Sequence, residues 1–425
     1  MDEGVGVAET KAFRGWWVIA GLFVVLMTSS GMGFYAQGVF LNALVKERGW
    51  STGVTSTGTA VFFVVSGLAG YLAAPYMQRI DVRRIIVVGS LIAAVGLLLI
   101  GRAQAEWQMF GANVVFGVGF ALSGLVPATT TVARWFVRRR SVALSVASTG
   151  LSAGGILVTP FVASLVKSEG IAVVTPWLAL VWVAVTLPVT IFVVRSSPAV
   201  VGQYPDGDPA PASGGPIGTP PGYTFAEARR TRFYAFAAAA YLCIMFGQVG
   251  GIAQQVKLVT ERQEWMAALS VTVVAGSSVC GRLAGGVVAS RYPVKKFTTA
   301  LIVVQGAALA LFAFAETSAM LLVTCVIFGL SVGNLLMLQP LLLADAFGVR
   351  EYPRIYSFAQ LITTIGVGVG PSAMGVLHDL SDYRLSYLVA AGSSVVAFVL
   401  FVAAGPAEPH QRLVAERAAA AAVPA

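Results

Sequence analysis

Charged residues are scarce in this chain: Asp, Glu, Lys and Arg make up 11% of its 425 residues, whereas 57% are hydrophobic. Soluble domains carry about 25% charged residues, so this composition excludes an ordinary soluble protein and indicates a chain that crosses a membrane several times. The formal net charge of +9 does not indicate nucleic-acid binding, because the basic residues are spread over many short loops. We therefore expect no nucleic-acid partner.

Residues that carry catalytic or metal chemistry are equally rare. The three cysteines, Cys243, Cys280 and Cys325, lie in apolar runs and are expected to be reduced, buried small hydrophobes. The two histidines, His378 and His410, form no metal-binding motif, and no acid–base pair lies within an apolar run. No Gly-Lys dipeptide occurs, which excludes a Walker A motif. The sequence argues against an intramembrane enzyme and against ATP hydrolysis, and we expect neither a cofactor nor a metal.

Long apolar segments are what the sequence has instead. Twelve occur, at residues 15–42, 51–77, 85–103, 106–134, 141–167, 174–195, 231–256, 266–290, 297–316, 318–346, 354–378 and 384–404. A helix needs roughly 20 apolar residues to cross a bilayer, and open strands cannot satisfy their backbone in lipid. The sequence therefore predicts an all-α membrane protein with twelve transmembrane helices that contact the lipid bilayer.

The distribution of basic residues predicts the orientation. An even number of spans places both termini on one side of the membrane, and most of the 28 Lys and Arg residues fall on that side. Because loops rich in Lys and Arg stay in the cytoplasm, we expect cytoplasmic termini and a multi-pass protein of the cell membrane. The apolar run after the polar first 14 residues is too long for a signal peptide, so we expect an uncleaved anchor.

A proline-rich stretch divides the chain. Seven of its 19 prolines lie between Pro198 and Pro221, which is typical of a linker without a packed core. Thr224 and Glu227 have capping-box spacing and predict the start of the helix that becomes the seventh span. The predicted organisation is a cytoplasmic N-terminus at 1–14, a six-helix bundle at 15–195, a cytoplasmic linker at 196–230, a second six-helix bundle at 231–404 and a cytoplasmic tail at 405–425.

The two halves share a repeated loop. Residues 74–84 align without gaps to residues 286–296, and each loop follows the second span of its half. The aligned basic residues are Arg79 with Arg291, Arg83 with Lys295, and Arg84 with Lys296. Repeated halves are typical of carriers whose binding site lies between two bundles near the middle of the membrane. The sequence thus predicts two pseudo-symmetric bundles around a central site.

One basic residue lies inside a span. Arg282 is nine residues from Arg291, roughly 13 Å along a helix. A guanidinium does not deprotonate, and inserting it costs at least about 2.5–3.5 kcal/mol. Snorkelling or a structural hydrogen bond would satisfy it, but this depth favours a water-filled cavity or a bound anion. Arg282 is therefore the leading candidate to bind a substrate carboxylate, in a bidentate pair.

Few other polar side chains lie inside the spans. The expected substrate contacts among them are Tyr35, Gln37, Gln254, Asn334 and Gln360. The alternative for each is a helix–helix hydrogen bond. No carboxylate lies deep in a span, so a coupled proton would travel with the substrate. Glycines at four-residue spacing predict close helix packing, and they are Gly150 with Gly154, Gly281 with Gly285, and Gly366 with Gly370.

The repeated loop resembles a motif of the major facilitator superfamily, in which a glycine, an aspartate and an arginine precede paired basic residues. The first copy keeps the arginine and the basic pair but has Gln78 for the aspartate, and the second has Ser290 there. The resemblance implies a fold of two six-helix bundles that rock about a central site. It also implies a gating role for the loop residues Arg79, Arg83, Arg84, Arg291, Lys295 and Lys296.

Further motifs resemble the monocarboxylate and oxalate:formate branch of that superfamily. They are Gly15-Trp16-Trp17, Arg48-Gly49-Trp50-Ser51, Ala133-Arg134-Trp135-Phe136, Gly281-Arg282 and Gly370-Pro371. The resemblance implies that Arg282 binds the carboxylate of the substrate. Two positions depart from the branch: Ser278 stands where monocarboxylate carriers often have an aspartate, and Gln360 lies near the place of the second cation of oxalate carriers.

The expected function is secondary active transport of a small organic anion, most simply a monocarboxylate, by a monomer without enzymatic activity. A single buried cation matches one carboxylate better than two. The alternatives are an exporter of hydrophobic compounds or drugs and a dicarboxylate:monocarboxylate exchanger. Arg282 argues against cationic cargo.

Overall fold

The structure is a computed structural model that describes residues 12–209 and 222–407. Within these residues, twelve helices are long and apolar enough to cross a membrane. The first six are formed by α1 (Gly15–Ser29) with η1 (Ser30–Tyr35) and α2 (Ala36–Arg48); α3 (Thr52–Ala73); α5 (Val82–Arg102); α6 (Glu106–Ser123) with α7 (Leu125–Trp135); α8 (Arg140–Ala153) with η2 (Gly154–Val158) and α9 (Thr159–Glu169); and α10 (Ile171–Pro188) with η3 (Val189–Val193). The last six are α12 (Arg232–Arg262); η6 (Glu264–Met266) with α13 (Ala267–Arg291); α14 (Val294–Phe314); α15 (Ser318–Phe347); α16 (Tyr352–Leu380); and α17 (Tyr383–Ala403).

The all-α fold and its twelve spans confirm the prediction from the apolar segments. Most helices extend a few residues beyond the apolar run, and some of their ends are capped. The first span runs to Arg48 and ends at Gly49, whose φ of 70° is the left-handed conformation that glycine adopts readily. Ser51 begins the next span by accepting a hydrogen bond from the Val54 amide at 3.2 Å.

The segment between the halves corrects one prediction. Thr224 and Glu227 do form a capping box, with the Thr224 amide 2.7 Å from Glu227 Oε2. They cap only the short helix α11 (Phe225–Ala228), and not the seventh span. That span begins at Arg232, where Thr231 caps the Tyr234 amide at 3.2 Å. A capping box specifies where a helix starts, but local side chains do not specify how far it continues.

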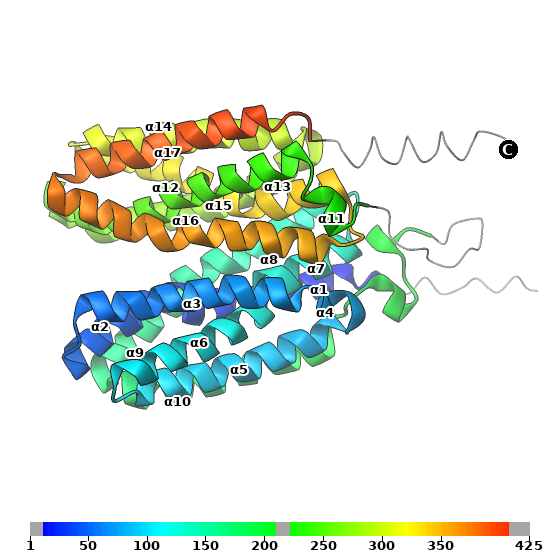
Figure 1. Cartoon of the computed structure of the whole chain (residues 1–425), viewed down its shortest axis with the longest axis horizontal. Coiled ribbons are helices and arrows are strands. Elements are labelled where there is room, and N and C mark those ends of the chain that lie inside the picture. The colour runs from blue at the N-terminus through cyan, green and yellow to red at the C-terminus, as the bar shows by residue number, and fades with distance from the viewer. Residues whose placement is uncertain (1–11, 210–221, 408–425) are drawn as a thin grey trace, which may run out of the picture.

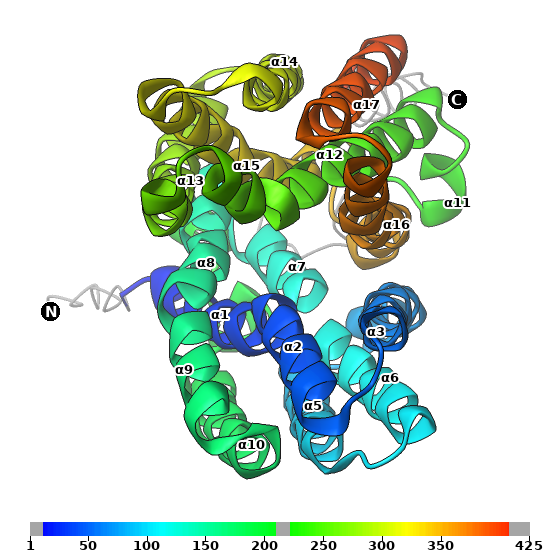
Figure 2. The same ribbon diagram turned by 90° about the vertical axis from the view of Figure 1, so that its left-hand side faces the viewer.

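The helices form two groups. Figure 1 and Figure 2 show α1–α10 in one group and α12–α17 in the other, with the short α11 beside α16. Within each group, glycines let helices touch through their backbones. A Cβ at Gly366 would overlap the Leu242 carbonyl of α12, and one at Gly150 would overlap the Phe23 carbonyl of α1. A Cβ at Gly281 would meet the Leu330 carbonyl of α15 at 2.8 Å. These contacts confirm the close packing predicted from the glycine spacing.

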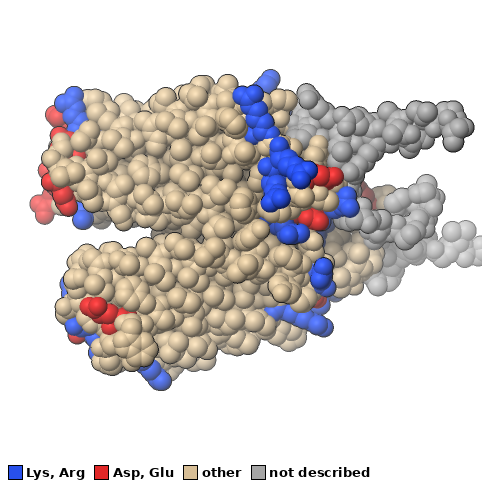
Figure 3. Space-filling model, viewed as in Figure 1, with Lys and Arg blue, Asp and Glu red and all other residues tan. Residues whose placement is uncertain are grey.

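The two groups contact each other at the end of the molecule where α1 begins and α17 ends, which we name the terminal end. There Tyr71 of α3 packs on Phe358 of α16 with ring centroids 5.4 Å apart. Arg140 of α8 pairs with Asp345 of α15 at 3.3 Å. Figure 3 shows charged residues at both ends of an apolar surface, and a hollow between the groups at the opposite end. The molecule is thus closed at the terminal end and open at the other.

Candidate substrate-binding cavity

A cavity of about 140 Å³ lies between the two groups of helices. Its wall is built from α1, η1, α3, α6, α7 and α8 of the first group and from α12, α13, α15 and α16 of the second. Most of the wall is apolar. Among the described residues that line it, Arg282 alone is charged. The cavity therefore occupies the central position that the repeated halves predict.

Arg282 is held by backbone carbonyls on two sides. Its side chain is 2% exposed, and Nε donates to the Gly333 carbonyl of α15 at 2.7 Å. Nη1 donates to the Ser148 carbonyl of α8, in the other group of helices. In the described ranges Nη2 makes no hydrogen bond and Arg282 forms no ion pair. A buried guanidinium without an ion-pair partner is chemically suited to an anion.

Helices α8 and α13 meet along a row of small residues, which we name the serine seam: Ser141, Ser145, Ser148, Ser152, Ser278 and Gly286. Ser145 Oγ donates to the Arg282 carbonyl at 2.5 Å. Ser152 and Ser278 share a hydrogen bond at 3.2 Å between their hydroxyls. A Cβ at Gly286 would overlap Ser145. Arg282 thus sits in the seam that joins the two groups of helices.

Two of the other predicted contacts lie on the cavity wall with Arg282. They are Tyr35 of η1 and Gln360 of α16, whose Oε1 accepts a hydrogen bond from Tyr356 at 3.2 Å. Gln248 of α12, a further polar residue of the seventh span, also lines the cavity. Its side chain is 3% exposed and its buried Oε1 has no hydrogen-bond partner. Gln248 thus places an unpartnered acceptor oxygen at the cavity wall.

The structure does not place the remaining three predicted contacts on the wall. Asn334 Nδ2 donates to the Gly281 and Leu330 carbonyls at 2.8 and 2.9 Å. Gln254 Nε2 donates to the Pro371 carbonyl at 3.3 Å. Gln37 is buried, and its Nε2 has no partner. In this conformation the side chains of Asn334 and Gln254 form helix–helix hydrogen bonds, the alternative to a substrate contact. A substrate role for all three residues stays a prediction.

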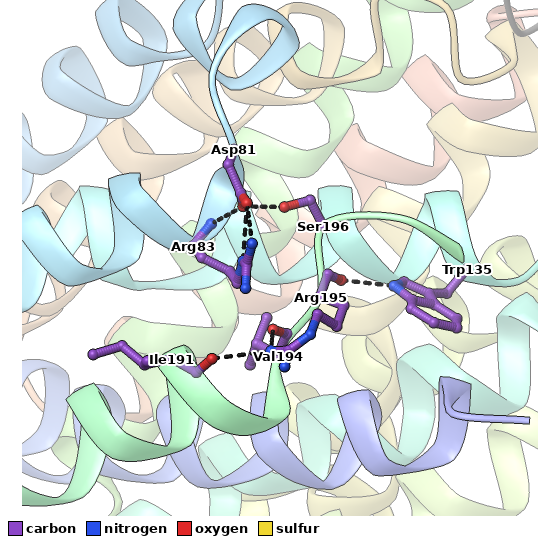
Figure 4. Close-up of polar contacts among 7 residues, drawn as sticks. All are labelled: Asp81, Arg83, Trp135, Ile191, Val194, Arg195 and Ser196. Carbon is purple, nitrogen blue, oxygen red and sulfur yellow. Dashed lines mark hydrogen bonds and ion pairs between the residues drawn. The ribbon is translucent and has the colours of Figure 1, made fainter. Parts of the chain in front are cut away.

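The repeated loop of the first half makes its contacts within that half. Asp81 accepts hydrogen bonds from Arg83 Nε at 2.9 Å and from Ser196 just after η3 (Figure 4). Burial alone would raise the pKa of Asp81, but the hydrogen bonds from Arg83 and Ser196 outweigh burial and lower this pKa to about 2. The ionised Asp81 thus ties the loop to the end of the sixth span. Trp135 Nε1 reinforces that end by donating to the Arg195 carbonyl at 2.7 Å.

The second half repeats this arrangement with different chemistry. Lys295, which aligns with Arg83, donates to the carbonyl of Gly405, just after the twelfth span. The other predicted gating residues, Arg79, Arg84, Arg291 and Lys296, are exposed. Each loop therefore contacts the end of the last span of its own half. A gating role for these six residues stays a prediction.

Two groups of residues at the site were not predicted from the sequence. One is the serines of α8 that contact Arg282 from behind the wall, and the other is the aromatic side chains Phe34, Phe63 and Phe120 on the wall. Serines and phenylalanines are ordinary residues of apolar spans, so a single sequence carries no signal that sets these apart.

Twelve spanning helices in two groups around a central cavity define a membrane carrier of small molecules. The chain belongs to the Major Facilitator Superfamily, whose family model matches residues 23–343 and 266–424. This membership makes it a multi-pass membrane transporter rather than an enzyme, with a small-molecule substrate and a lipid environment. It confirms the resemblance drawn from the sequence motifs.

Curated relatives support the monocarboxylate branch. Monocarboxylate transporter 11 of Mus musculus is 26% identical over 395 residues, which cover 88% of this chain and 84% of the relative. Monocarboxylate transporter 4 of Gallus gallus is 23% identical, with 97% and 89% covered. The MFS transporter asaE of Aspergillus flavus is 22% identical, with 87% and 81% covered. The chain thus resembles these relatives over nearly its whole length.

Solved structures share the fold. The fucose:proton symporter FucP of E. coli has a TM-score of 0.69 at 16% identity, covering 93% of this chain and all of that one. FucP in the outward conformation has a TM-score of 0.67 at 17% identity, with 92% and 98% covered. The human organic anion transporter MFSD10 has a TM-score of 0.67 at 12% identity, with 91% and 99% covered. At these identities the likeness extends to the fold alone.

Proposed function

We propose that this chain is a secondary active transporter of a small organic anion, most simply a monocarboxylate, which Arg282 binds through its carboxylate. The observation that carries the proposal is the Arg282 guanidinium, buried on the cavity wall without a carboxylate partner in the described part of the chain. A planar guanidinium and a carboxylate match in charge and in geometry. The names of the relatives that are monocarboxylate transporters support this substrate class.

Alternating access follows from the contacts of Arg282. Opening the terminal end requires α8 to separate from α13, and this breaks the bond from Arg282 to the Ser148 carbonyl. An empty carrier would leave that donor without a partner at a cost of about 1–3 kcal/mol. A bound carboxylate provides a replacement acceptor before the seam parts. In this mechanism the substrate lowers the barrier to its own transport.

The orientation belongs to the same proposal. The terminal end holds most of the Lys and Arg residues, and such loops stay in the cytoplasm. The hollow at the opposite end then faces the outside of the cell membrane, so the conformation described here is outward-facing. The proposed substrate site lies within one chain, so the proposed functional unit is a monomer.

The alternatives differ in what the cavity must bind. A dicarboxylate needs a second cation, and the described wall offers only Arg282. A neutral hydrophobic drug would suit the apolar wall but would leave the guanidinium desolvated and unpaired, which is costly. A monocarboxylate satisfies both the charge and the apolar surface.

A thermal-shift series on the purified protein tests the substrate class. Monocarboxylates should raise the melting temperature more than dicarboxylates of similar size, because a ligand that binds the folded state stabilises it by mass action and a second carboxylate would stay unpaired. The matched pair is butyrate and succinate, with butanol as the uncharged control. A larger shift with succinate would reveal a second cation, and equal shifts with butyrate and butanol would exclude carboxylate recognition.

A further inference from the structure

The wall of the cavity is divided chemically between the two halves. Its aromatic side chains all come from the first half: Phe34, Tyr35, Phe63 and Phe120. Its charged and amide side chains all come from the second half: Gln248, Arg282 and Gln360. A ligand that fills the cavity therefore meets an aromatic surface on one side and a polar surface on the other.

The aromatic side is continuous and held from behind. The ring centroids of Phe34 and Phe63 are 5.4 Å apart in an edge-to-face arrangement. The fully buried Phe62 contacts both Phe63 and Phe120, with centroids 5.0 and 5.1 Å apart. Rings at such distances attract one another and leave faces and edges for a further ring. The surface suits a planar apolar group.

The serine hydroxyl groups on the aromatic side are already engaged. Ser30 donates to the Leu151 carbonyl at 2.8 Å, and Ser66 donates to the Phe63 carbonyl at 2.8 Å. Ser29 donates to the Leu26 carbonyl at 3.4 Å. On the opposite side, Gln248 Oε1 and Arg282 Nη2 have no hydrogen bond to described residues. The charged and amide groups of the wall that remain for a ligand thus lie in the second half.

From this division we infer that the substrate is an aryl-substituted monocarboxylate, with its ring on Phe34, Phe63 and Phe120 and its carboxylate on Arg282. The inference rests on the proposed function and names the substrate class of the same site. A short acid reaches Arg282 but leaves the aromatic surface uncovered, whereas burying a ring removes apolar area from water.

Competition binding to the purified full-length chain tests whether the ring, its aromaticity and the carboxylate each contribute to affinity. The probes are 3-phenylpropionate, 3-cyclohexylpropionate, propionate and 3-phenylpropanol. We expect 3-phenylpropionate to bind at least about 10-fold more tightly than propionate, and more tightly than the other two. Equal binding of propionate would overturn the inference and leave the proposed function standing. Equal binding of the cyclohexyl acid would overturn the aromatic assignment. Equal binding of the alcohol would overturn the proposed function itself.

Substitutions on the wall give a second readout that survives a change in overall stability. In Phe63→Leu the ratio of propionate Kd to 3-phenylpropionate Kd should fall by about 3-fold or more, because ring–ring contact is lost. Phe34→Leu serves the same purpose if Phe63→Leu does not fold. The matched control is Phe110→Leu, which lies in the same half, partly buried and away from the wall. An unchanged ratio in both wall variants would overturn the inference.

Discussion

Under the proposed function Arg282 combines two roles in one side chain, because its Nε and Nη1 donate to backbone carbonyls and Nη2 would bind the ligand. Lysine at this position would keep the charge but offer one nitrogen in place of a planar fork. We expect Arg282→Lys to lower transport at least about 10-fold, because the variant loses one bidentate contact with the carboxylate. Its effect on the melting temperature without substrate should be much smaller. Uptake of a radiolabelled monocarboxylate into proteoliposomes measures transport, and a thermal melt of the purified variant measures its melting temperature.

The control for this variant is Arg102→Lys, because Arg102 is exposed at the open end of the molecule. Normal uptake by Arg282→Lys would remove the bidentate pair from the mechanism. Normal uptake by Arg282→Gln would remove Arg282 altogether.

Among helices, the serine seam offers a matched pair of glycines on α13. A side chain at Gly286 meets Ser145 of α8, whereas one at Gly276 meets nothing within 4 Å. Overpacking costs about 1–3 kcal/mol, so Gly286→Leu should part α8 from α13 and favour the conformation that is open at the terminal end. Spin labels at the exposed Tyr76 and Tyr292, in a cysteine-free chain, should move apart in Gly286→Leu and keep their distance in Gly276→Leu. An unchanged distance in both would mean that the seam does not hold this conformation.

The sequence predicts where the helices lie along the chain, but not which side of each helix faces the cavity. The twelve spans follow from composition, because each lipid-crossing helix needs its own apolar run. How a helix is rotated does not follow, and this explains Asn334 and Gln254, which are polar and central but bond to neighbouring backbones. Arg282 could be found because a buried charge needs a partner. Ser148 and Phe63 could not, because their roles come from where α8 and α3 lie in the tertiary structure.

For the molecule as a whole, the two groups of helices meet through side-chain and backbone contacts that do not involve the proline-rich linker. A chain cut between Pro209 and Pro220 should therefore reassemble when both fragments are co-expressed, since helix packing holds the halves together. Reassembly is measured by comparing transport in cells that express both fragments with transport in cells that express either fragment alone. Both fragments in the membrane without transport would show that continuity of the linker is required.

The carbonyl anchorage of Arg282 has an electrical consequence. Carbonyls hold the guanidinium without neutralising it, and in the described part of the chain no carboxylate pairs with it. If a monovalent anion binds there as proposed, the loaded site is neutral and the empty site carries one positive charge. One charge crossing the full membrane potential is worth about 2.3 kcal/mol per 100 mV. Voltage would then act on the return of the empty carrier and leave the exchange of one anion for another nearly untouched, so that the cell's polarisation sets net flow.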